Sequence, residues 1–179
     1  MNVVSTMGSG DLGRELNLDS VIDSLKNEFD IESNWHRDSM VTVRLEPDGP
    51  ALTLYRTGTY QIRGTDSRDS LLDANKALLS ALERIGVEFT EPSFEQKNAV
   101  YLEDFDRTIQ LEALAVHLGL ENVEYEPEQF PGVIYRPPEL GTVNLVFSSG
   151  KTIISGTIHE DVAERSVEEL SQRLSTLPT

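Results

Sequence analysis

The sequence contains no cysteine and no long apolar run. Without cysteine there is no disulfide, no zinc–thiolate site and no cysteine nucleophile. No apolar stretch approaches the roughly 18 residues needed to span a membrane, and the first residues lack the basic and apolar regions of a signal peptide. We therefore expect a cytoplasmic protein that makes no membrane contact.

Positive charge is also scarce. The chain has 15 Lys and Arg residues, only 4 of them Lys, against 31 Asp and Glu, so its net charge is −16. Such a surface normally disfavours nucleic acid, because phosphate binding requires basic groups. At molar salt, however, the Debye length falls to about 3 Å and long-range repulsion largely disappears. The composition favours a protein from a salt-loving organism over the alternative, an ordinary acidic cytosolic protein.

Residues typical of metal and catalytic sites are sparse. The three histidines lie in different predicted elements without a second ligand at metal spacing, and no nucleophile motif appears. We therefore expect no metal, no cofactor and no enzymatic activity. The segment Gly8–Gly13, GSGDLG, matches the G-x-G-x-x-G fingerprint of dinucleotide sites. The strands predicted after it follow one another through short turns, whereas a parallel nucleotide-binding sheet requires helical crossovers. The strand order therefore argues against a dinucleotide site.

The chain is internally duplicated. GTYQIRGT, which starts at Gly58, matches GKTIISGT, which starts at Gly150, and Leu16–Leu25 matches Ile109–Leu118. The two copies are roughly 92 residues apart, from Gly58 to Gly150. Such a long period indicates a duplicated domain rather than a solenoid of short repeats. We assign residues 1–89 to the first repeat, 90–97 to a linker and 98–179 to the second repeat.

Each repeat is predicted to hold a strand, a short helix, further strands and a longer closing helix. Apolar residues at helical spacing predict helices at 18–29, 67–85, 111–118 and 159–177. Strands are predicted at 2–7, 40–45, 51–56, 59–64, 98–105, 123–126, 133–136, 143–147 and 152–156. The fold class is therefore α+β. The strands carry apolar residues toward both faces, but the helices suffice to cover one. We expect a partner on the other face.

Two segments carry a family resemblance. Glu121–Arg136, ENVEYEPEQFPGVIYR, and Val143–Gly156, VNLVFSSGKTIISG, closely resemble the second-repeat motif of the archaeal TATA-box-binding proteins. The resemblance implies a duplicated saddle, with a curved antiparallel sheet and with helices on its convex face. It further implies that the concave face grips the minor groove of TATA-like promoter DNA in the nucleoid. Transcription factor B, and through it RNA polymerase, are the implied partners.

The resemblance also implies roles for individual residues. Phe130, before Pro131-Gly132, would insert with Phe147 into a base step, and Arg136 and Lys151 would meet phosphates. Glu126 and Glu128 would contact transcription factor B. The DNA-binding residues implied in the second repeat are Asn98, Val100, Phe130, Arg136, Val143, Leu145, Phe147, Lys151, Ile153 and Ser155.

The first repeat departs from the family pattern. The family positions there fall on Asn2, Val4, Trp35, Tyr55, Gln61 and Arg63. Tyr55 and Trp35 would supply the two wedges, although no Glu-Gln-Phe-Pro-Gly segment is present, and Gln61 and Arg63 make this half more polar. The chain therefore resembles a diverged paralogue with a degenerate first repeat. Two functions stay open: an initiation factor that bends promoter DNA, or an interaction module that binds transcription factor B or another partner without bending DNA. Homodimer formation through the uncovered face is a further alternative.

Overall fold

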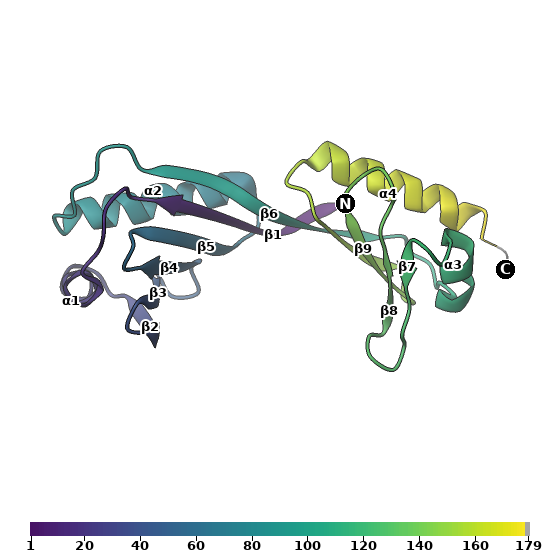
Figure 1. Cartoon of the computed structure of the whole chain (residues 1–179), viewed down its shortest axis with the longest axis horizontal. Coiled ribbons are helices and arrows are strands. Elements are labelled where there is room, and N and C mark those ends of the chain that lie inside the picture. The colour runs from purple at the N-terminus through teal and green to yellow at the C-terminus, as the bar shows by residue number, and fades with distance from the viewer. Residues whose placement is uncertain (178–179) are drawn as a thin grey trace. The chain divides into compact units, whose positions relative to one another are not determined.

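The structure is a computed structural model that describes residues 1–177. The chain folds as two compact units (Figure 1). Ser5–Lys97 form the first-half unit, and Met1–Val4 together with the residues from Asn98 onward form the second-half unit. Two long strands, β1 (Asn2–Asp11) and β6 (Ser93–Asp104), run through both units. Residues 93–97, predicted as part of a linker, therefore belong to a strand.

The first-half unit packs two helices on one face of an antiparallel sheet. Its strands are β2 (Glu32–Arg37), β3 (Met40–Arg44), β4 (Ala51–Tyr55) and β5 (Thr59–Thr65), in the order β2-β3-β4-β5-β1. The helices are α1 (Leu18–Glu28) and α2 (Arg68–Arg84). Along β3, β4 and β5, buried side chains alternate with partly exposed ones. The buried set packs with Leu25 and Leu78 of the helices in one core, so the helices cover a single face.

The second-half unit repeats this arrangement. Its strands are β7 (Val123–Glu124), β8 (Gly132–Tyr135), β9 (Val143–Phe147) and β10 (Lys151–Ser155), in the order β6-β10-β9-β8-β7. The helices α3 (Leu111–Leu118) and α4 (Glu160–Ser175) supply Leu114 and Leu170 to a core with Val133 and Val146. In Figure 1, the loop between β7 and β8 extends away from the α4 side of the sheet.

Local signals explain where the helices begin. The Asn17 side chain accepts a hydrogen bond from the Ser20 amide at 3.1 Å and caps α1. Ser67 and Ser70 form a reciprocal capping box at α2. The sequence of Thr157–Glu160 resembles a capping box, but the N-cap of α4 is His159 and no side chain caps the helix. The amides of Val162 and Ala163 donate to the His159 carbonyl instead.

The fold class predicted from the sequence, α+β with an antiparallel sheet and helices on one face, is confirmed. The main difference is β2, a six-residue strand that was not expected. No helix within residues 1–177 is long and apolar enough to cross a membrane.

Candidate functional site

The second-half unit leaves one face of its sheet without helices, and this face is apolar. Val143, Leu145 and Phe147 alternate along β9 with the fully buried Asn144 and Val146. The same alternation puts further predicted residues on this face, namely Asn98 and Val100 of β6 and Ile153 and Ser155 of β10. Asn2 and Val4 of β1 flank Val3, which packs under the helices. The structure thus brings these predicted residues together.

An aromatic pair lies at the rim of this face. The rings of Phe130 and Phe147 are 5.7 Å apart between centroids and tilted by 58°. Both rings are partly exposed. The backbone amide of Phe130 donates to the Glu126 carbonyl at 2.9 Å, which closes the turn behind the ring. A Cβ atom at Gly132 would lie 2.9 Å from Cε1 of Phe130, so glycine gives this ring its place beside β8. The loop and the end of β9 therefore bring two partly exposed rings together.

Charged residues surround the pair. Arg136, predicted to contact phosphate, donates to Glu124 at 2.6 Å in an exposed ion pair. Such pairs contribute about 0–1 kcal/mol, so the guanidinium can change partners at little cost. Lys151 is exposed at the start of β10. Glu126 binds the side chain of Gln129 within the loop, and Glu128 is exposed.

The uncovered face of the first-half unit is polar. Tyr55 ends β4 and is opposite Met40, as Phe147 ends β9 and is opposite Gly132. Gln61 and Arg63 lie on β5, where they alternate with the buried Tyr60 and Ile62. Nη2 of Arg63 donates to Oε1 of Gln61 at 2.9 Å. These predicted residues share one face, but only Tyr55 brings an aromatic ring to it.

The structure does not bring Trp35 and Tyr55 together, contrary to the expected wedge pair. Trp35 is opposite Val41, so its side chain belongs to the helix-covered side, whereas Tyr55 belongs to the uncovered side. The reason is local: β2 and β3 are joined by a two-residue turn at Asp38–Ser39. In the second-half unit, the corresponding strands β7 and β8 are joined by the longer loop from Tyr125 to Pro131. A tight hairpin leaves no loop to carry a second ring.

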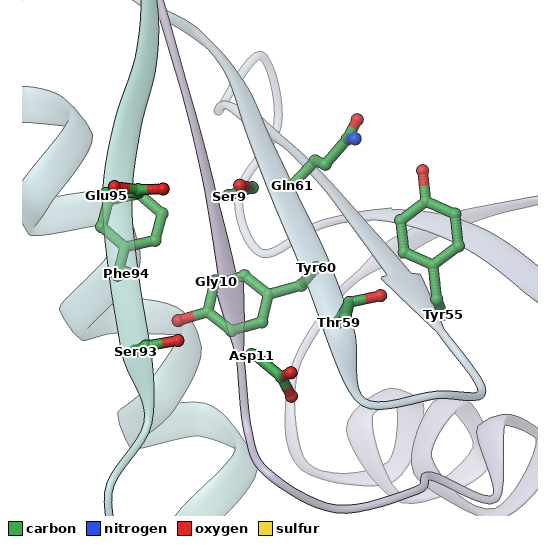
Figure 2. A pocket seen from close by; sticks show the side chains of 10 residues that line it. All are labelled: Ser9, Gly10, Asp11, Tyr55, Thr59, Tyr60, Gln61, Ser93, Phe94 and Glu95. Carbon is green, nitrogen blue, oxygen red and sulfur yellow. The ribbon is translucent and has the colours of Figure 1, made fainter.

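Two of the three glycines of GSGDLG have a packing role. Gly8 and Gly10 lie within β1, and a Cβ atom at Gly10 would be 2.2 Å from Cζ of Tyr60. Tyr60 is fully buried and stacks on Phe94, with ring centroids 6.0 Å apart. Figure 2 shows the Tyr60 ring reaching across β1 toward Phe94. These glycines therefore make room for two rings and form no phosphate-binding turn.

A hollow of about 610 Å³ adjoins this packing at the ends of β1 and β5. Its polar lining includes Ser9, Asp11, Thr59, Gln61 and Glu95 (Figure 2). Within residues 1–177, no group of three or more His, Asp or Glu side chains could hold a metal ion.

Two buried tyrosines have strongly shifted titrations. Burial, and secondarily the charge of Asp11, raises the pKa of Tyr60 to about 12. Burial, and next its hydrogen bond to Glu169 at 2.7 Å, raises the pKa of Tyr135 to about 12. Both tyrosines lie in the cores between the sheets and the helices, on the side of each sheet opposite its uncovered face.

Sequence reasoning missed several residues of the uncovered faces. Ile134 and Leu102 continue the apolar face of the second-half unit, and Ser9 and Thr42 continue the polar face of the first. The alternation in Val133-Ile134-Tyr135 could have identified Ile134. The pairing of strands distant in sequence, which places Leu102 opposite Ile153, leaves no local signal.

Comparisons with known proteins agree with this geometry. The family described as "Transcription factor TFIID (or TATA-binding protein, TBP)" matches residues 1–85 and 93–177. TATA-box-binding protein C of Halobacterium salinarum is 41% identical, over 99% of this chain and 98% of its own. TATA-box-binding protein 2 of Haloferax volcanii is 37% identical, over 98% and 92%.

A solved structure shows the same fold. The TBP of Methanococcus jannaschii superposes with a TM-score of 0.81 at 28% identity and covers 99% of this chain and 98% of its own. The similarity to proteins of salt-loving archaea also agrees with the acidic composition of the chain. The family comprises transcription factors rather than enzymes, as expected. The chain is therefore a member of the TATA-box-binding protein family.

Proposed function

We propose that this protein is a transcription initiation factor that binds and bends TATA-like promoter DNA through the minor groove. The observation that carries the proposal is the Phe130–Phe147 ring pair at the rim of an uncovered apolar face. A flat apolar strip suits sugar and base edges in the minor groove, and paired rings at its end can unstack a base step. The resulting kink favours flexible T·A steps.

The acidic surface sets the conditions for this activity. With a net charge of −16, long-range repulsion opposes DNA binding at low salt and is screened at molar salt. Arg63, Arg136 and Lys151 are the cations proposed to meet DNA, so few counterions are released. Binding should therefore hold or strengthen as KCl rises toward molar concentration.

The test is DNA bending measured by energy transfer between the ends of a TATA-like duplex in molar KCl. The wild-type protein should bend the duplex, and Phe130→Ala should lose most of the bend. Leu120→Ala is the matched control, because Leu120 is 71% exposed outside the strands. Equal bending by Phe130→Ala and the wild type would contradict the wedge role.

Recruitment of transcription factor B is the second part of the proposal. Glu128 is exposed on the loop next to Phe130, and Glu126 is exposed but bound to Gln129. Glu128→Gln should weaken factor B binding without changing DNA bending. An alternative function rests on the polar first-half face: the chain would bind factor B, or another partner, as a regulator without bending DNA. Absence of bending with retained factor B binding would support that alternative.

A further inference from the structure

Equivalent strands of the two units carry opposite chemistry across their uncovered faces. In the second-half unit, strand pairing aligns Ile134, Leu145, Ile153 and Leu102 as one transverse row over β8, β9, β10 and β6. In the first-half unit, the corresponding row over β2, β3, β4, β5 and β1 is Asn34, Thr42, Thr53, Gln61 and Ser9. The first row is wholly apolar over these four strands and ends at Glu124 of the edge strand β7, which is opposite Ile134. Every member of the second row can form hydrogen bonds.

The polar row is already organised by hydrogen bonds. Nε2 of His36 lies 2.9 Å from Oγ1 of Thr42, which lies 2.9 Å from Oγ1 of Thr53. Arg63 donates to the amide oxygen of Gln61 and fixes its orientation. Hydroxyl and amide oxygens have two lone pairs each, so the row keeps accepting capacity, and the Gln61 amide nitrogen keeps donating capacity. The face thus offers donors and acceptors.

This difference matters because of what base pairs display in the minor groove. A·T and T·A pairs display only acceptors, whereas a G·C pair adds the guanine 2-amino donor. An apolar row would cover that donor without giving it a partner, which is costly. A row of hydroxyl and amide oxygens can accept from it.

We propose that the polar row lets the first-half unit accept a G·C pair in its part of the DNA site, while the apolar row of the second-half unit excludes one. The inference rests on the proposed function and deepens it, since it makes the two halves of one DNA site chemically unequal. Thr42, Thr53 and Gln61 are the specificity-determining residues.

The experiment measures affinity by fluorescence anisotropy in molar KCl for four duplexes. One has A·T pairs throughout both halves, two have a single G·C pair in one half or the other, and one has a G·C pair in each half. The protein can bind the duplex in either of two orientations, so it can place its first-half unit over a single G·C pair. Each single substitution should therefore lower the affinity at most about twofold. The double substitution should cost roughly 10- to 100-fold, the range for one unmatched pair.

Variants then assign the effect to the row. Thr53→Val with Gln61→Leu makes the row more apolar, so a single G·C pair should then cost roughly 10- to 100-fold. Gln61→Leu alone should give part of this effect. Thr57→Val, an exposed position in the turn after β4, is the control and should leave the pattern unchanged. The fluorescence of Trp35 reports whether each variant is folded.

The outcomes are distinguishable. Absence of binding to the all-A·T duplex overturns the proposed function, and this inference with it. Binding to that duplex with a 10-fold or larger loss for both single substitutions overturns this inference alone. Because the chain has no cysteine, a dye on Leu120→Cys can report orientation by energy transfer to one DNA end. A preferred orientation on each single-substitution duplex supports the inference, and equal populations of the two orientations contradict it.

Discussion

Replacing Gly10 by alanine should destabilise the first-half unit. The new Cβ atom would lie 2.2 Å from Cζ of Tyr60, 2.4 Å from its hydroxyl oxygen and 2.6 Å from the carbonyl oxygen of Ser93. Neither obstacle can give way freely. Tyr60 is fully buried against Phe94, and Ser93 is held in β6.

The magnitude follows from three contributions. Overpacking a filled core costs about 1–3 kcal/mol. If the Tyr60 ring moves, its hydrogen bond to Asn75 at 2.7 Å is strained, at a cost of about 1 kcal/mol. The smaller entropy of an unfolded chain with alanine offsets about 0.5 kcal/mol. The net loss is about 1.5–3.5 kcal/mol, which lowers the urea midpoint by roughly 1 M.

The assay is urea unfolding followed by the fluorescence of Trp35, the single tryptophan, which lies in β2 of the first-half unit. Ser9→Ala, on the opposite face of the same strand, is the control and should change stability by less than about 0.5 kcal/mol. In a Tyr60→Leu background, which removes Cζ and the hydroxyl, Gly10→Ala should cost about 1–2 kcal/mol less. An equal cost in both backgrounds would refute the proposed clash with Tyr60.

Three further predictions concern stability and salt. Oγ1 of Thr152 is buried without a hydrogen-bond partner among residues 1–177, so Thr152→Val should raise the free energy of unfolding by about 1 kcal/mol in urea titrations, and a loss would show that the hydroxyl is bonded. Because the pKa values of Tyr60 and Tyr135 are raised to about 12 in the folded protein, folding stability should be complete below pH of about 10 and fall as pH rises toward about 12. Tyrosinate absorbance should still rise near pH 12, where Tyr60 and Tyr135 titrate, and Tyr60→Phe should reduce that rise; an unchanged rise would contradict the assignment. Affinity for TATA-like DNA should stay level or increase between 0.2 and 2 M KCl in anisotropy titrations, and a steep decrease would indicate many phosphate contacts.

Much of the fold follows from periodicity in the sequence. All four helices and nine of the strands were predicted, because apolar residues recur at helical or alternating spacing. Two strands are longer than predicted: β1 extends to Asp11 rather than Met7, and β6 begins at Ser93 rather than Asn98. The exception, β2, reads ESNWHR and is almost wholly exposed. An edge strand that buries neither face has no such pattern, so only its pairing with β3 identifies it.

The candidate site, like the fold, was predicted from the sequence only in part. Phe130 and Phe147 were predicted from a specific motif, and the structure brings their rings together. Trp35 was placed by counting positions, which failed because the turn at Asp38–Ser39 is shorter than the loop in the other unit. The two transverse rows depend on strand register across segments far apart in sequence, which no local pattern encodes.

The second-half unit includes the first four residues of the chain, Met1–Val4. Val3 packs against the cluster of Ala99, Tyr101 and Ile154, although it belongs to the first repeat in sequence. A peptide covering only residues 98–179 would leave that cluster open to water. A cut at the repeat junction should therefore destabilise the piece 98–179, whereas residues 1–97 keep the whole first-half unit. Adding residues 1–97 should restore the second half, so that half is best studied by complementation.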